Sequence, residues 1–156
     1  MSETRVAEAA QAATVVRPCP SCGVRNRIPV ARLTETGRCG KCKTELPPLR
    51  EPLDADTALF DEVIRSVRVP VLVDFWAAWC APCRMAAPEV QRAADNTAGR
   101  AVVLKVDTEA HPDLAARFGV RSIPNFVVLR DGRVQAQRAG LVNHAQLEEW
   151  LRAAGA

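Results

Sequence analysis

The sequence predicts an α/β fold, a mixed central sheet with helices on both faces, preceded by a small module that carries four cysteines. After about residue 52, segments of helical periodicity alternate with nearly continuous apolar segments, which is the pattern of a sheet covered on both faces. Asp131-Gly132 is a two-residue hairpin signal between two strand-like runs. Two Cys-x-x-Cys pairs ahead of this region define the module.

We expect three regions along the chain: a flexible tail over 1–16, the four-cysteine module over 17–50 and a larger domain over 51–156. The tail is rich in Ala and has no large side chain, so it cannot bury enough surface to order itself. The Pro47-Pro48-Leu49-Arg50-Glu51-Pro52 segment predicts a stiff linker between module and domain. The module has few large apolar side chains and should need a metal cross-link to fold, whereas the domain should have its own core.

The strands are indicated by short runs of β-branched and aromatic residues. Val71–Trp76 and Ala101–Val106 are almost entirely apolar, as in central strands that are buried on both faces. Phe126–Leu129 is a third such run, and the Asp131-Gly132 turn connects it to a strand at Arg133–Arg138. The last two strands should therefore form an antiparallel hairpin.

Helices are indicated by apolar residues at helical spacing. We expect four of them in the domain, at residues 54–66, 82–97, 112–118 and 144–153. The first presents one apolar face, made of Leu59, Phe60, Val63, Ile64 and Val67. Pro88 should kink the second helix. The last helix should turn Leu147, Trp150 and Leu151 toward the core.

The stretch Trp79-Cys80-Ala81-Pro82-Cys83 joins the first apolar strand to the second helix. Pro82 suits a first helical turn, where its missing N–H costs nothing. Cys80 should therefore lie at a helix N-terminus, where free N–H groups and the helix dipole favour thiolate over thiol. Cys83 lies three residues on, within reach of a disulfide. A lone Cys-x-x-Cys is also half of a zinc site, but the preceding strand, the Pro and the Trp favour a disulfide-exchange centre in which Cys80 attacks and Cys83 resolves.

The module holds Cys19-x-x-Cys22 and Cys39-x-x-Cys42, with sixteen residues between the pairs. Two such pairs at about this separation build four-thiolate zinc sites. Gly23 and Gly40 permit the left-handed backbone conformations that such turns often need. We expect one zinc ion bound by Cys19, Cys22, Cys39 and Cys42, with two disulfides or free thiols as the alternatives.

The charge of the chain is unevenly placed. Residues 1–50 carry nine Lys/Arg and four Asp/Glu, whereas residues 51–156 carry twelve and fourteen. Basic zinc modules often contact phosphates, but no aromatic residue between Arg17 and Arg50 could stack on a base. We therefore expect the cations to offset the charge of the zinc thiolates, and no nucleic-acid partner. No apolar stretch is long enough for a membrane span and no secretory signal is recognisable, so we expect a cytoplasmic monomer without a membrane partner.

The sequence WCAPC after VLVDFWA resembles the active site of the thioredoxin family. Lys105 in VVLKVDTE, Ile123-Pro124 in GVRSIPNFVVL and Gly140 in QRAGLV fall where that family places functional residues. The resemblance covers residue 52 to the C-terminus, and the CPSC…CGKC module makes the chain similar to the bacterial thioredoxin 2 type. It implies a thioredoxin fold and a protein-disulfide reductase, recycled by an NADPH-dependent thioredoxin reductase and acting on disulfide-bearing client proteins, with no organic cofactor bound directly.

The resemblance also implies roles for residues around the cysteines. Asp74 would be a buried carboxylate that takes a proton from Cys83, with Lys105 beside it; from the sequence alone, Asp74 could equally face outward and Lys105 could be an ordinary strand-edge cation. An X-Pro bond is trans by default, but the family match predicts a cis Pro124 that offers the backbone of Ile123 to a client strand. The implied docking surface comprises Trp79, Ala81, Pro82, Ile123, Pro124 and Gly140.

Two positions depart from the family pattern. Ala81 stands where Gly usually separates the cysteines, and Asn125 stands where Thr usually follows the cis-proline. Neither change removes a catalytic group. The sequence leaves two alternative functions: an oxidant or isomerase in an oxidising compartment, and a zinc-based binding or redox-regulated chaperone-like module. The missing secretory signal and the zinc-type thiols oppose the first alternative. The intact set Asp74, Cys80, Cys83 and Pro124 opposes the second. The reductase is therefore favoured, with the zinc module as an accessory or a redox sensor.

Overall fold

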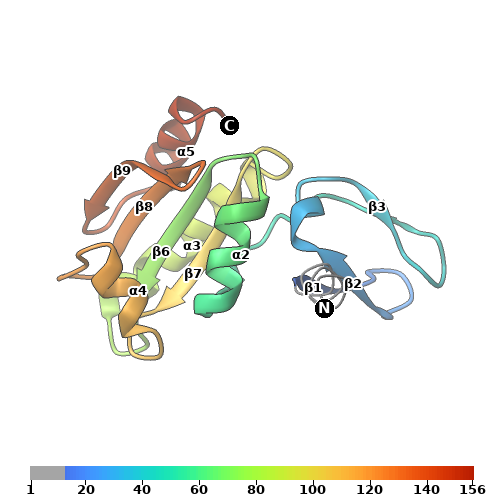
Figure 1. Ribbon diagram of the computed structural model, residues 1–156, viewed down its shortest axis with the longest axis horizontal. Coiled ribbons are helices and arrows are strands. Elements are labelled where there is room, and N and C mark those ends of the chain that lie inside the picture. Colours follow the sequence, from blue (N-terminus) through green and yellow to red (C-terminus); the bar gives the residue numbers. More distant parts are fainter. Residues whose placement is uncertain (1–12) are drawn as a thin grey trace, which may run out of the picture.

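The computed structural model describes residues 13–156, and Figure 1 shows its helices and strands. A five-stranded mixed sheet forms the centre of the domain, with the strand order β5-β7-β6-β8-β9. Strands β5, β7 and β6 are parallel, and β8 and β9 are added antiparallel. The strands are β5 Leu53–Asp54, β6 Val71–Trp76, β7 Val102–Asp107, β8 Asn125–Arg130 and β9 Arg133–Ala139.

Helices cover both faces of this sheet, as predicted (Figure 1). They are α2 Thr57–Ser66, α3 Ala81–Asn96, α4 Pro112–Arg117 and α5 His144–Ala153. Phe60 of α2 and Leu114 of α4 pack in one apolar cluster with Val73 of β6. On the opposite face, Leu72 packs in a second cluster with residues of α3 and α5 such as Leu147. Because neighbouring residues of a strand point to opposite faces, β6 contributes to both clusters and is buried on both sides.

The first helix of the domain begins later than its periodicity predicted. It starts at Thr57 and not at residue 54, because the side chain of Asp56 accepts a hydrogen bond from the N–H of Leu59 at 2.8 Å and caps the helix. Leu53 and Asp54 instead pair with β7 as the short edge strand β5. The Asp131-Gly132 hairpin is confirmed, with φ of 53° and 77° at its two turn residues.

The four-cysteine module is built from two antiparallel strand pairs, β1 with β2 and β3 with β4. Its elements are β1 Thr14–Pro18, β2 Arg25–Pro29, the 3-10 helix η1 Val30–Arg32, β3 Gly37–Arg38 and β4 Glu45–Leu46. Strand β1 starts at Thr14, so residues 14–16 belong to the module and not to the expected tail. The reason is that Val15 lies opposite Ile28 in the strand pair and both pack against the apolar core. The rest of the expected tail, up to residue 12, lies outside the described residues.

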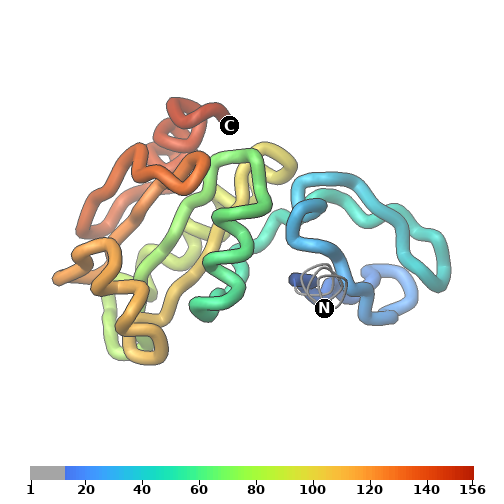
Figure 2. Tube along the Cα trace, viewed as in Figure 1, coloured from blue at the N-terminus to red at the C-terminus, as the bar shows by residue number. Residues whose placement is uncertain are grey.

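The module shares a core with the domain, contrary to the expectation of a spacer between them. Val30, Leu33 and Leu49 are buried in the same apolar cluster as Phe60 and Val63 of α2. The N–H of Leu49, inside the proline-rich segment, donates to the carbonyl of Leu33 at 2.9 Å. Figure 2 shows the chain of the module running beside α2. The proline pattern predicted a stiff segment, which is a separate property from burial, and Leu49 within it is buried.

No helix within residues 13–156 is long and apolar enough to cross a membrane.

Candidate functional site

The disulfide-exchange centre lies where β6 gives way to α3. Cys80 is the N-cap of α3 in an extended conformation, and Cys83 occupies its first turn. The two form a disulfide with their Cα atoms 5.2 Å apart. The N–H of Cys83 donates to Sγ of Cys80 at 3.2 Å. The predicted position of Cys80 at a helix N-terminus is therefore present, and both the N–H and the helix dipole would stabilise a thiolate there.

Both sulfurs are almost covered, since each cysteine is only 4% exposed. Ala77 is buried with them, and half-buried Trp76 and Ile123 pack against the same small cluster. Sγ of Cys80 lies 3.7 Å from the carbonyl oxygen of Ile123. The sulfur of Cys80 therefore lies against the backbone of Ile123.

A shallow hollow of about 370 Å³ lies beside the disulfide, with Trp79 and Ile123 in its lining. Trp79 is 67% exposed, and its Nε1–H donates to Oε1 of Glu109 at 2.9 Å. Ala81 and Pro82 are exposed on the first turn of α3. Sequence reasoning missed Glu109, although an exposed Trp with a polar ring edge commonly has such a partner.

The Ile123–Pro124 peptide bond is cis, as the resemblance implied. Pro124 is buried, and its carbonyl accepts a 2.8 Å hydrogen bond from the N–H of Gly140, which has φ of 101°. Asn125, the residue that departs from the family pattern, is buried, and its Oδ1 accepts from Nε2 of Gln137 at 3.3 Å. Gln137 was not singled out in the sequence, because its contact depends on the pairing of β8 with β9.

Asp74 lies inside the sheet, only 2% exposed. Its neighbours in register are Lys105 on β7 and Phe126 on β8. Strand alternation places it on the same face as Leu72, the face that α3 covers. Its Oδ1 has no hydrogen-bond partner within the described chain. Burial raises the pKa of Asp74 to about 7, and the nearby charge of Lys105 opposes that rise only in part.

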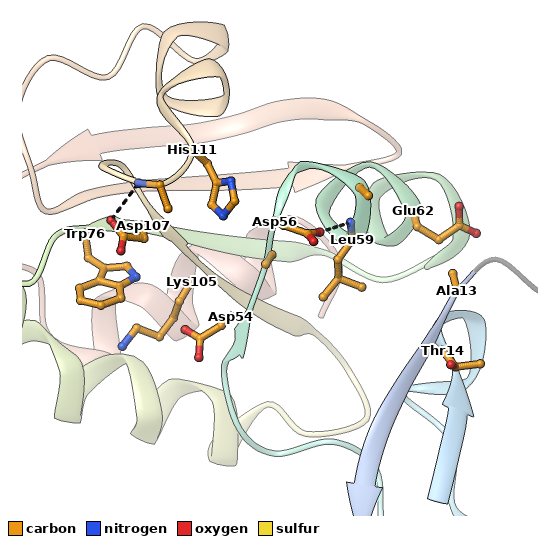
Figure 3. Close-up of a pocket in the computed structure, with 13 residues that line it drawn as sticks. Ala13, Thr14, Asp54, Asp56, Leu59, Glu62, Trp76, Lys105, Asp107 and His111 are labelled. Atoms are coloured by element: carbon orange, nitrogen blue, oxygen red, sulfur yellow. Dashed lines mark hydrogen bonds between the residues drawn. The ribbon is translucent and has the colours of Figure 1, made fainter.

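Lys105 opens onto a second and larger hollow of about 640 Å³ at the β5 edge of the sheet. Its Nζ lies 4.7 Å from the ring centre of Trp76, a cation–π contact. Figure 3 shows Trp76 and Lys105 at one end of this hollow and Ala13 and Thr14 of the module at the other. Lys105 therefore contacts Trp76 and is only partly exposed to solvent. Residues of the module line the same hollow as Lys105.

The four cysteines of the module converge on one point. Their sulfur atoms all lie within 4.8 Å of one another, and the four residues are Cys19, Cys22, Cys39 and Cys42. Cys19 and Cys39 are buried, whereas Cys22 and Cys42 are exposed. Backbone N–H groups of Cys42 and Lys41 lower the pKa of the Cys39 thiol to about 6. At Cys22 a backbone hydrogen bond from Val24 lowers the pKa, but desolvation and the neighbouring sulfurs outweigh it and raise the pKa to about 11. A metal ion requires all four sulfurs as thiolates. Four sulfur donors at this spacing fit a tetrahedral zinc ion.

The two cysteine pairs have the same backbone hydrogen bonds. The N–H of Cys19 donates to the carbonyl of Val24 and that of Cys39 to the carbonyl of Thr44, each at 2.8 Å. The left-handed residue that closes each turn is Gly23, with φ of 77°, and Lys43, with φ of 66°. The expectation for Gly40 is therefore wrong. A left-handed residue is needed after the second cysteine of each pair, and Gly40 lies within its pair.

Asn26 joins the two pairs and was not predicted. It lies on β2, and its Oδ1 accepts a hydrogen bond from the N–H of Gly40 at 3.0 Å. Thr44 adds a second support, because the thiol of Cys42 donates to its Oγ1 at 3.0 Å. A polar residue that is only half-buried in a strand carries no sequence signal for such a role.

Two family profiles match different parts of the chain. The profile described as Thioredoxin matches residues 51–153, and the profile described as Thioredoxin 2, N-terminal, a zinc ribbon, matches residues 18–44. The chain belongs to the thioredoxin family. Thioredoxin C-3 of Corynebacterium nephridii is 40% identical to it over 133 residues, 85% of this chain and 90% of that protein.

Further similarities concern the thioredoxin domain. Thioredoxin 1 of Chlorobaculum tepidum is 42% identical over 96 residues, 61% of this chain and 95% of that protein. A solved structure of a mutant thioredoxin from Halobacterium salinarum NRC-1 superposes with a TM-score of 0.64 at 32% identity, over 69% of this chain and 93% of that chain. The thioredoxin identified here is a thiol–disulfide oxidoreductase that reduces protein disulfides, and its four-cysteine module is a zinc-binding ribbon. The family implies disulfide-containing clients and, usually, a thioredoxin reductase.

Proposed function

We propose that Cys80 is the attacking thiolate of this thioredoxin and that Cys83 is the resolving thiol. The observation that carries the assignment is the position of Cys80 at the N-cap of α3, with the N–H of Cys83 directed at its sulfur. A thiolate at that position is stabilised both by the N–H and by the helix dipole. Asp74 is proposed as the proton acceptor of Cys83, supported by its burial and its pKa of about 7.

The reaction proceeds in two exchange steps. The thiolate of Cys80 attacks one sulfur of the client disulfide, forms a mixed disulfide and expels the other client sulfur as a thiolate. Cys83 then gives its proton to Asp74 and attacks the sulfur of Cys80, which releases the second client thiolate. Two electrons pass from the dithiol to the client, and the Cys80–Cys83 disulfide remains.

We propose that clients dock on the exposed surface around the disulfide. Trp79 and Ile123 line the adjoining hollow, and the backbone of Ile123 would pair with an extended client segment, as in recognition by strand addition. The other residues proposed for this surface are the exposed Ala81, Pro82 and Gly140, together with the buried Pro124 next to Ile123. The chain would work as a monomer in the reducing cytoplasm, where an NADPH-dependent thioredoxin reductase returns two electrons to the pair.

Two single substitutions test the assignment of the cysteines. Cys80→Ser should abolish turnover of a protein disulfide in the presence of reductase and NADPH, whereas Cys83→Ser should retain the client as a stable mixed disulfide. Alkylation of the reduced protein near neutral pH should label Cys80 before Cys83. Faster labelling of Cys83 would reverse the roles. The same turnover assay distinguishes a reductase from an oxidant or isomerase and from a binding module, since only a reductase consumes NADPH steadily.

We propose that one zinc ion is held by Cys19, Cys22, Cys39 and Cys42 and that its first role is to fold the module. A zinc ion binds four thiolates together and supplies the cross-link that the small module otherwise lacks. The exposed sulfurs of Cys22 and Cys42 are the ones that an oxidant would reach first. A redox-sensing role would be supported if mild peroxide released zinc and changed the reductase rate together. Zinc release without any change of rate would leave the module as an accessory surface.

A further inference from the structure

The zinc module contains a small hollow that is unrelated to the disulfide. It measures about 180 Å³, and its lining includes the side chains of Arg17, Arg32 and Arg38. Ile28 and Leu46 also line it, and both pack against the buried cysteines Cys19 and Cys39. Three arginines therefore line the hollow, and its apolar floor, Ile28 and Leu46, packs against the buried cysteines.

Arg17 is the unusual member of this group, because it lies on the inner side of strand β1. Val16, its neighbour, is 40% exposed, whereas Arg17 is half-buried on the same side of the strand pair as Ile28. Its Nη1–H donates to the carbonyl of Pro47 at 2.8 Å. A guanidinium has five N–H donors, and residues 13–156 provide no other hydrogen bond or ion pair for Arg17 that meets ordinary distances. Arg17 therefore has N–H donors at the edge of the hollow that form no hydrogen bond within the described residues.

The other two arginines are also weakly engaged. Nε of Arg32 lies 3.7 Å from the carboxylate of Glu35, and both side chains are largely exposed, so that pair is worth little. Nη1 of Arg38 makes one long contact of 3.4 Å with the carbonyl of Lys43. Glu45 lies opposite Arg38 in the strand register, but it does not line the hollow and, within the described chain, it forms no ion pair.

The charges around the hollow specify the kind of ligand that would complement it. Among the lining residues, three arginines and one carboxylate, Glu35, leave an excess of two positive charges, and Glu51 outside the lining acts on Arg17 through its negative charge. A phosphate group carries about −1.5 to −2 charges at neutral pH, and guanidinium groups recognise it through paired hydrogen bonds. The volume of about 180 Å³ is below the roughly 300–1,000 Å³ of pockets for drug-sized molecules and leaves room for a phosphate group.

We propose that this hollow is a binding site for a phosphate dianion, either free or carried by a side chain of a partner protein. Arg17, Arg32 and Arg38 donate to its oxygens, and Thr36, which also lines the hollow, offers a hydroxyl. The apolar floor strengthens these charge-assisted bonds by excluding water from one side. If the arginines only balanced the charge of the zinc thiolates, zinc retention would depend on them and phosphate would not bind in a saturable way.

The test uses the full-length, zinc-loaded protein and inorganic phosphate at constant ionic strength. Phosphate should produce saturable shifts in the NMR signals of the Gly37 amide and of the arginine side chains. Arg38→Gln and, separately, Arg32→Gln should each weaken binding by roughly tenfold or more. The matched control is the pair Arg25→Gln and Arg27→Gln, which removes charge from the outward face of β2 and should change the affinity less than about twofold.

The outcomes separate the proposal from its alternatives. The zinc content of each variant is measured first, so that a loss of phosphate binding with zinc retained supports the site. Non-saturable shifts, or an equal loss in the Arg25 and Arg27 control, would overturn it in favour of diffuse charge attraction. A phosphoserine peptide distinguishes the two sources of the ligand: tighter binding than inorganic phosphate indicates a partner side chain, and equal or weaker binding indicates free phosphate.

Discussion

Burial of the Asp74 side chain lowers the stability of the fold and also gives this carboxyl a pKa that suits proton transfer. A carboxylate without a hydrogen-bond partner for one oxygen is expensive to ionise inside a sheet. The same penalty places its pKa near 7, where a group can accept and return a proton at neutral pH. Lys105, its register neighbour, limits the penalty without removing it.

Asp74→Asn should remove a pH-dependent loss of stability. The pKa of Asp74 is about 7 in the folded chain and about 3.9 in the unfolded chain. Between these values the folded state binds more protons, so the free energy of unfolding falls as pH rises from about 4 to about 7. Asn loses no proton, so the variant should be more stable by about 1–4 kcal/mol near pH 8 and similar near pH 4.

Urea unfolding at the two pH values checks this expectation. Asp131→Asn is the matched control, because Asp131 is an exposed carboxylate in a turn conformation that Asn tolerates. A stability difference for Asp74→Asn that is the same at both pH values would contradict the elevated pKa. The variant should also slow turnover by about tenfold or more near neutral pH, with accumulation of the mixed disulfide. Unchanged turnover across the pH range would rule out the role in proton transfer.

At the scale of elements, the sequence predicted what depends on local periodicity. The apolar runs of β6 and β7 were recognisable because strands that are buried on both faces consist mainly of apolar residues. The hairpin at Asp131-Gly132 was recognisable because a left-handed turn favours Asp and Gly. Strand β5 was not predicted, because a strand of two residues is too short to show an alternation of apolar and polar residues. The same limit applies to the site: Cys80 follows from the helix start, whereas the pairing of Asn125 with Gln137 exists only once β8 and β9 are aligned.

Lys43→Gly should strengthen the second cysteine turn. Lys43 has φ of 66°, the conformation that Gly23 adopts at the equivalent place of the first turn. A residue with a side chain costs about 1 kcal/mol there relative to glycine, part of which is offset by the extra freedom of glycine in the unfolded chain. Zinc transfer to a chelator should therefore be slower by up to about fivefold.

Lys41→Gly is the control for this substitution, because Lys41 lies in the same turn without a left-handed backbone. It should leave the rate of zinc transfer unchanged or raise it. Faster zinc loss from Lys43→Gly would mean that the contact of Lys43 Nζ with the carbonyl of Gly40, at 3.1 Å, outweighs the backbone effect.

Leu33→Ala should destabilise both parts of the chain together. Leu33 follows η1, is 1% exposed and packs in the cluster that contains Phe60 and Val63 of α2. Truncation of a buried Leu costs about 2–5 kcal/mol, and here the cavity would border both the module and the domain. Zinc retention and the thermal midpoint of the domain should fall in parallel, while Val134→Ala on the exposed face of β9 should change neither. A fall in zinc retention alone would show that the two parts are energetically separate.

The whole molecule is a redox domain and a zinc ribbon joined through one apolar cluster. Sequence patterns separated the two parts correctly by chemistry but could not show that Leu49 is buried between them, because burial of a short proline-rich segment depends on what packs against it. A spacer would let the ribbon unfold without consequence for the domain. Because the two parts share an apolar cluster, unfolding of the ribbon also removes stabilising contacts from the domain.

Removal of zinc should therefore lower the stability of the thioredoxin domain as well. All three tryptophans, Trp76, Trp79 and Trp150, lie in that domain, so tryptophan fluorescence reports its unfolding without a signal from the module. Chelation should lower the midpoint of thermal unfolding by several degrees, since about 1 kcal/mol shifts a domain of this size by roughly 4 °C. An identical midpoint with and without zinc would contradict the coupling of the two parts.

The hollow beside Trp79 and the hollow beside Lys105 open at different places and have no lining residue in common. One, beside Trp79 and Ile123, is where a client would sit; the other, beside Lys105, is bounded by β1 of the ribbon. A client that covers the first leaves the second open to water. The ribbon therefore borders the hollow beside Lys105 and not the hollow beside Trp79.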